Sequence, residues 1–202
     1  MSPLLLAFAG LSAGGLHVLA GPDHLAAVAP LAADSSRRRW LAGMLWGIGH
    51  TGGVVLVAAV AFVARGWLDI GAVSSWSERL VGVALIGVGL WGLQRVIGQR
   101  IHTHDAPTAH THASFAFGIL HGLAGSAHVI GVLPALALPT AADAAIYLGA
   151  YGVGNVLAMT VFSALMGALG AATRRTGIDL HRGLIAACSL AAIAVGSYWL
   201  IS

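Results

Sequence analysis

The stretch His17-Val-Leu-Ala-Gly21-Pro-Asp23-His24 decides the fold class, because it places ionisable side chains inside a strongly apolar segment. A related stretch, His121-Gly-Leu-Ala-Gly125-Ser-Ala-His128, follows 104 positions later, and Pro30 and Pro134 stand at the same distance after the two copies. Ionisable groups at membrane depth are costly to bury, so they mark functional sites by default. We infer that two halves of the chain share one polar site.

The composition indicates an integral membrane protein. Of the 202 residues, 58% are hydrophobic and 8% are charged, with a mean hydropathy of +0.87, whereas soluble domains carry about 25% charged residues. The net charge of +3 is small and scattered, which argues against nucleic-acid binding. The one cysteine, Cys188, excludes an internal disulfide or a dithiol redox centre. The N-terminus lacks the basic region of a signal peptide, so we expect a retained first span.

Hydropathy predicts six membrane spans, each long enough to cross a bilayer. They cover residues 3–33, 40–64, 80–97, 115–138, 144–172 and 183–201. The first is too long for one simple crossing, and Gly21-Pro22 interrupts it, so we expect a helix, a break and a half-helix. Gly125 predicts a similar break in the fourth span.

The second and fifth spans also repeat, since Trp46-Gly-Ile-Gly-His50 matches Tyr151-Gly-Val-Gly-Asn155 at an offset of 105 positions. The fold is therefore predicted to be all-α, with three-helix repeats at 1–100 and 114–202 and a His-rich loop at 101–113. Because three spans is an odd number, the second repeat enters the membrane inverted. Inverted repeats with broken helices are typical of transporters with a midplane site. The tryptophans are interpreted as core residues or interfacial anchors.

The distribution of arginine predicts the orientation in the membrane. Eight of the ten arginines lie in loops on one predicted side, and only Arg65 and Arg79 lie on the other. The positive-inside rule places the arginine-rich loops, including residues 101–113, in the cytoplasm and both termini outside the cytoplasmic membrane. Asp34 is interpreted as an ordinary loop charge and His181 as a solvated residue of a polar loop.

The candidate metal ligands combine imidazoles with one carboxylate and one amide. Within the membrane they are His17, Asp23, His24, His50, His121, His128 and Asn155. Imidazole suits nickel, cobalt, copper and zinc, and the lack of a thiolate or methionine cluster argues against Cu(I). The set lacks the carboxylates of a calcium or magnesium site. Each histidine taken alone is also compatible with a simple bond between helices. Weak auxiliary metal binding is expected in the loop at His102, His104, Asp105, His110 and His112.

These motifs resemble the nickel/cobalt transporter family, and more closely its short relatives, the UreH-type nickel permeases of urease systems. The resemblance rests on residues 17–24, 46–50 and 121–128 and covers about residues 14–166. The main family has four residues between its first histidine and its Asp-His pair, and this chain has five. The resemblance implies movement of Ni²⁺ or Co²⁺ across the cytoplasmic membrane. The residues that match the functional positions are His17, Asp23, His24 and His50.

The sequence therefore predicts a secondary permease for divalent nickel or cobalt, with zinc also compatible, that has no prosthetic group and no enzymatic activity. Its partners would be the lipid bilayer, the metal ion and a urease or hydrogenase metal-insertion system; import and export are both open. One alternative is an exporter of another small solute, such as an amino acid or organic acid, with histidines as proton relays. The other is a metal-handling accessory protein. No His-Glu-x-x-His motif supports a protease.

Overall fold

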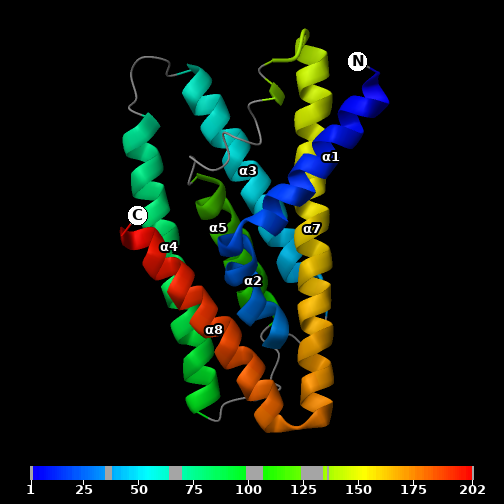
Figure 1. Ribbon diagram of the computed structural model, residues 1–202. Helices are drawn as coiled ribbons and strands as arrows, with labels where there is room; N and C mark the ends of the chain where they lie inside the picture. Colours follow the sequence, from blue (N-terminus) through cyan, green and yellow to red (C-terminus); the bar gives the residue numbers. More distant parts are fainter. Residues whose placement is uncertain are drawn as a thin grey trace.

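The computed structural model is all-helical in the part of the chain that it describes (Figure 1). It describes residues 2–34, 38–63, 70–98, 107–123, 134–135 and 137–201, without the side chains of 57–63, 70–75, 77 and 107–111. The helices are α1 (Pro3–Ala20), α2 (Pro22–Asp34), α3 (Leu41–Val63), α4 (Ile70–Ile97), α5 (Pro107–Leu123), α7 (Ala141–Thr176) and α8 (Ile178–Ile201). Among the described residues, α1, α4, α7 and α8 contain stretches long and apolar enough to cross a membrane. The chain is a multi-pass membrane protein.

The predicted break in the first span is confirmed at Gly21-Pro22. Pro22 has no backbone N–H with which to continue the hydrogen bonds of α1, but its ring suits the first position of a new helix. Gly21 has extended backbone angles, with φ −91° and ψ 102°, and its N–H donates to the His17 carbonyl at 3.2 Å. The corresponding break predicted at Gly125 lies outside the described residues.

The predicted second, third, fifth and sixth spans agree with observed helices in their centres and differ at their ends, while the centre of the predicted fourth span lies outside the described residues. Helices α3, α7 and α8 cover the predicted second, fifth and sixth spans, while α4 begins at Ile70 rather than at residue 80. Helix α5 begins at Pro107, so the part of the predicted His-rich loop from Pro107 to Ala113 is helical and that boundary is wrong. A proline at the first position of a helix is preorganised for helical φ, which is why Pro107 begins a helix here rather than a loop.

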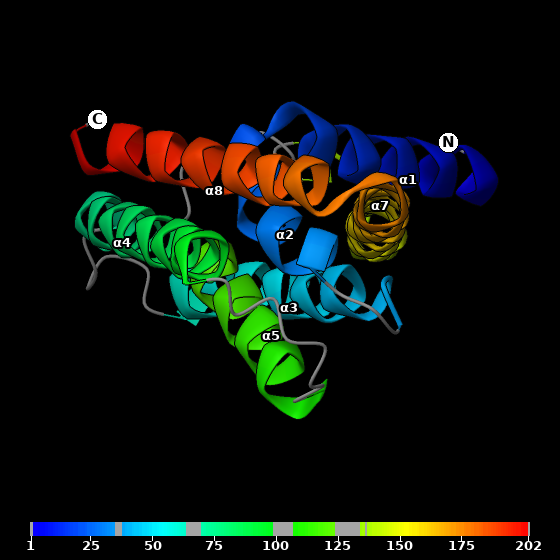
Figure 2. The same cartoon turned by 90° about the horizontal axis from the view of Figure 1, so that it is seen from below.

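Helix α2 lies at the centre of the bundle, as the view from below shows (Figure 2). It contacts α1, α3, α4, α7 and α8. Its buried positions are mainly small residues: Ala26, Ala27, Ala29, Ala32 and Ala33. Small side chains let neighbouring helices approach closely within a membrane. The half-helix that carries Asp23 and His24 is therefore enclosed by protein.

Glycines mediate the most extensive helix pairs, which are α1 with α7, α3 with α5, and α4 with α8. A Cβ added to Gly14 in α1 would collide with the carbonyl oxygen of Tyr151 in α7. A Cβ added to Gly118 in α5 would collide with the carbonyl oxygen of Trp46 in α3. Lipid gives little hydrophobic drive for helix association, so close backbone packing is what stabilises such pairs.

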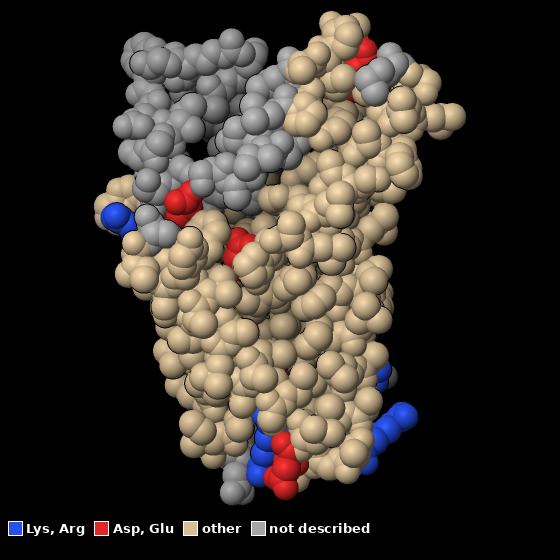
Figure 3. Space-filling view, in the orientation of Figure 1, with Lys and Arg blue, Asp and Glu red and all other residues tan. Residues whose placement is uncertain are grey.

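The outer faces of the bundle are apolar. Leu4 and Phe8 in α1 are 84% and 68% exposed, and Ile201 in α8 is 85% exposed. The space-filling view shows a broad band of surface free of charged residues above a charged lower end (Figure 3). This surface fits the hydrocarbon layer of a bilayer.

Polar contacts join the helices at the end of the bundle where α2 and α7 end and α8 begins. Arg95 Nη1 lies 3.0 Å from Asp34 Oδ2, and Arg174 Nη1 donates to the Ala33 carbonyl at 3.1 Å. His181 is fully buried, and its Nε2 lies 3.2 Å from Arg174 Nη1. The interpretations of Asp34 as a loop charge and of His181 as solvated are wrong, because α2 runs to residue 34 and α8 begins before residue 181.

Candidate metal site

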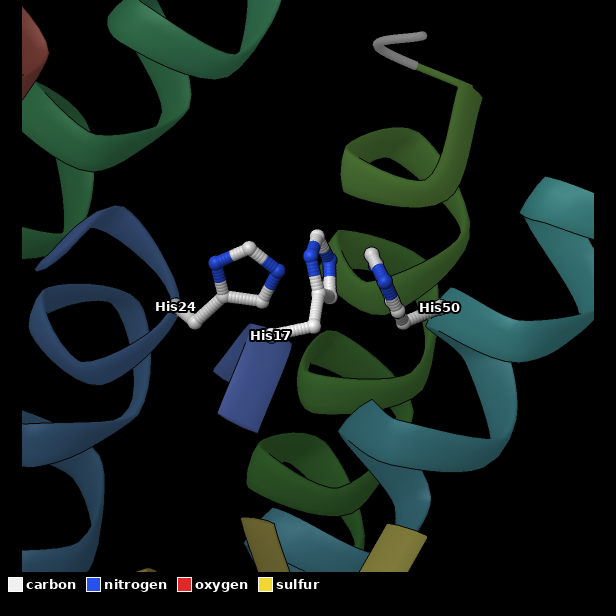
Figure 4. Close-up of side chains that lie close together, drawn as sticks. All are labelled: His17, His24 and His50. Carbon is white, nitrogen blue, oxygen red and sulfur yellow. The ribbon is translucent and has the colours of Figure 1, made fainter. Parts of the chain in front are cut away.

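Four imidazoles from four different helices meet beside the start of α2. They are His17 of α1, His24 of α2, His50 of α3 and His121 of α5. The ring centroid of His24 lies 4.7 Å from that of His17, 5.1 Å from that of His50 and 4.6 Å from that of His121. His24, His50 and His121 are at most 3% exposed, and His17 is half-buried. Figure 4 shows the rings of His17, His24 and His50 side by side.

The break between α1 and α2 brings His17 and His24 together. In a continuous helix the spacing of seven residues would put them on one face, whereas here the structure holds their rings edge to face, at 85°, across the predicted break. Gly21 is necessary here for space. A Cβ at Gly21 would collide with His24 Nδ1 and lie 2.8 Å from Asp23 Oδ1. The Asp23–His24 pair thus folds back over the glycine.

Asp23 uses its two oxygens to contact two histidines from different halves of the chain. Its Oδ1 lies 2.9 Å from His24 Nδ1, and its Oδ2 lies 3.0 Å from His121 Nε2. The residue is 4% exposed. A buried carboxylate is tolerated only where partners compensate for the loss of water. Its place in the first turn of α2 adds the favourable field of the helix N-terminus.

The side chains form two triads that share His24. One is His17, His24 and His50, and the other is Asp23, His24 and His121. Within each triad the ligand atoms lie within 4.8 Å of one another. Ligands about 2.1 Å from one ion are about 3–3.5 Å apart, so movements of about an ångström would close either triad around a metal.

Aromatic rings border the imidazoles, among them those of Trp46 and Tyr151. The Trp46 ring lies parallel to that of His50, at 4.9 Å and 8°, and its centroid is 5.3 Å from those of both His24 and His121. The Tyr151 ring lies 5.8 Å from that of His17. The interpretation of Trp46 as core or anchor missed this contact with the site. The available signal was its position one turn before His50, matched by Tyr151 one turn before Asn155.

The role of metal ligand stays a prediction for all of these residues and for the remaining candidates. Asn155 lies in α7 at 1% exposure, and neither amide atom makes a hydrogen bond of ordinary geometry to a described residue. His112 is exposed on α5. Outside the described residues or side chains lie His102, His104, Asp105, His110 and His128.

Comparison with known proteins gives three relatives, while no family model and no solved structure matches. Chloroplast protein FOR GROWTH AND FERTILITY 2 of Arabidopsis thaliana is 33% identical, over 98% of this chain and 57% of the relative. Chloroplast protein FOR GROWTH AND FERTILITY 1 of the same plant is 33% identical, over 96% of this chain and 58% of the relative. This chain therefore spans little more than half the length of the plant proteins. The third relative, a bacterial urease accessory protein from Bacillus sp. (strain TB-90), is 30% identical over 72% of this chain and 69% of the relative.

Proposed function

This chain belongs to the family of the urease accessory protein UreH, and from that membership we propose that it is a permease for divalent nickel or cobalt ions. The observation that carries the proposal is the buried cluster of four imidazoles and one carboxylate. Imidazole is a favourable ligand for these metals. Five such groups at the centre of a membrane bundle are costly unless they serve a function.

An inverted duplication would let one central site open alternately to the two sides of the membrane. Close contacts between a glycine and a backbone carbonyl support this duplication, because the contacts recur at the same offsets as the sequence motifs. The matched contacts are Gly14–Tyr151 with Gly118–Trp46, and Gly154–Leu11 with Gly49–Phe115. The chain also runs in opposite directions through α1 and α5 (Figure 1). We infer six spans in two inverted repeats that rock against each other.

The proposed orientation places the end of the bundle that holds Arg95, Arg174 and Arg182 in the cytoplasm. Arginine-rich ends of membrane helices are retained on the cytoplasmic side. Both termini would then lie outside, in the cytoplasmic membrane of the cell. Metal leaving or entering the site on the inner side would meet a urease or hydrogenase metal-insertion system, and the name of the bacterial relative supports the urease system.

The test is radioactive nickel flux in vesicles that contain the full chain. His24→Gln and Asp23→Asn are expected to lower the flux by at least about tenfold. His181→Gln is the matched control, because it removes a buried imidazole from the polar cluster at the arginine-rich end and leaves both triads intact. Flux that is unchanged in both site variants would overturn the site assignment.

One observation favours a second candidate function, the transport of another solute coupled to protons. Asp23 links His24 and His121, and a carboxylate between two imidazoles can pass protons. Calorimetry of the purified protein with Ni²⁺, Co²⁺ and Zn²⁺ at neutral pH separates the two functions. Binding of any of these ions supports the metal permease, and the absence of binding by all three favours the proton relay.

A further inference from the structure

His24 belongs to both triads, and its two ring nitrogens face different neighbours. Nδ1 lies 2.9 Å from Asp23 Oδ1. The other ring nitrogen, Nε2, points toward His17 (Figure 4). One ion can therefore bind His24 at Nδ1, beside Asp23, or at Nε2, beside His17. The charge state of Asp23 decides which of the two nitrogens has a lone pair for the ion.

An ionised carboxylate only accepts hydrogen bonds, so the ring nitrogen that faces it carries the proton. His24 Nδ1–H then donates to Asp23, and a neutral His24 keeps its lone pair on Nε2, the atom directed at His17. His121 Nε2, 3.0 Å from the second oxygen, is likewise directed at Asp23. In the Asp23–His24–His121 triad, both carboxylate oxygens thus already face an imidazole nitrogen, whereas the His17–His24–His50 triad has at least one lone pair oriented into it.

We propose that the ion binds to His17, His24 and His50 in this conformation, and that Asp23 is a positioning residue rather than a ligand. This inference rests on the proposed function. Metal-bound histidines commonly donate their second N–H to a carboxylate, which fixes the ring and raises its basicity. For Asp23 itself to ligate the ion, the ion would have to share or displace an oxygen that already contacts an imidazole, at 4% exposure, where little water can replace a broken contact.

The role of His121 follows from the same geometry. It contacts the oxygen of Asp23 that His24 does not use, and it lies on α5 rather than on α1, α2 or α3. It therefore keeps the carboxylate oriented toward His24. The second triad becomes available to the ion only when α5 moves away from α2 and the contact between His121 and Asp23 breaks.

The experiment counts imidazoles around Co²⁺ and Ni²⁺ by X-ray absorption of the purified full chain, together with their affinities. These measurements are made in a variant, the background, in which alanine replaces the histidines of the predicted auxiliary loop site: His102, His104, His110 and His112. In this background we expect three imidazoles. His17→Ala is expected to remove one of them. His121→Ala and Asp23→Asn are expected to keep three and to weaken binding by about 10- to 100-fold.

His121→Gln separates positioning from general damage, because its amide can still donate to Asp23; affinity should return toward that of the background. Loss of an imidazole from the metal shell in His121→Ala, or an unchanged imidazole count in His17→Ala, would overturn the inference. A background protein that binds no metal would instead contradict the proposed function.

Discussion

Gly21→Ala is expected to disable the metal site while leaving the helix bundle folded. The φ of Gly21, −91°, is accessible to alanine, so the backbone at the break tolerates the change. The added Cβ, however, would collide with His24 Nδ1 and lie 2.8 Å from Asp23 Oδ1. These two atoms form the 2.9 Å contact that orients His24. The methyl group must therefore push the imidazole away from the carboxylate.

Loss of a carboxylate partner behind a metal-binding histidine weakens affinity by about 10- to 100-fold. This change corresponds to about 1.4–2.7 kcal/mol of binding free energy. Gly15→Ala is the matched control, because it makes the same substitution in α1, two residues before His17, where a Cβ would meet nothing within 4 Å. Its affinity for nickel should equal that of the unchanged protein.

The assay is calorimetric titration of the purified protein with Ni²⁺, with elution volume and thermal midpoint recorded for each variant. The expected result is weak binding by Gly21→Ala only, at an unchanged elution volume. Equal nickel affinity in Gly21→Ala and Gly15→Ala would refute the reasoning that the Asp23–His24 contact over Gly21 shapes the site.

Four further outcomes are expected. Gly118→Ala should destabilise the protein by about 1–3 kcal/mol in thermal unfolding, because its Cβ meets a backbone carbonyl, while Gly149→Ala, which faces open space, should not. Asp34→Asn should lower stability by at most about 1 kcal/mol, since its contact with Arg95 is partly exposed, and the charge-swapped pair should restore it. Ni²⁺ should quench the fluorescence of Trp46 in a variant without the other tryptophans; full emission at saturating metal would contradict the site. Metal binding should weaken from about pH 7.5 to about pH 5.5, because protons compete for neutral imidazoles, and a pH-independent affinity would exclude imidazole ligands.

Local chemistry made much of the fold predictable. Hydropathy alone indicates a membrane protein, and the missing N–H of Pro22 predicts the end of α1 and the start of α2 at the observed residues. The beginning of α5 at Pro107 was not predicted, because a polar and His-rich composition is typical of a loop. The burial of His181 was also missed, since it depends on the contacts of α8 with α7 at the arginine-rich end.

By itself, the sequence determined that imidazoles and one carboxylate lie in apolar spans, that the first span is broken beside them, and that the motifs recur. Only the tertiary structure decided that His50 and His121 reach His24, and that Asp23 faces two histidines at once. The reason is that ligand geometry depends on distances of a few ångströms between helices. Those distances depend on the points at which two helix backbones pack against each other, as α5 at Gly118 packs against the carbonyl of Trp46 in α3. Neither the order of residues nor their hydropathy specifies that contact.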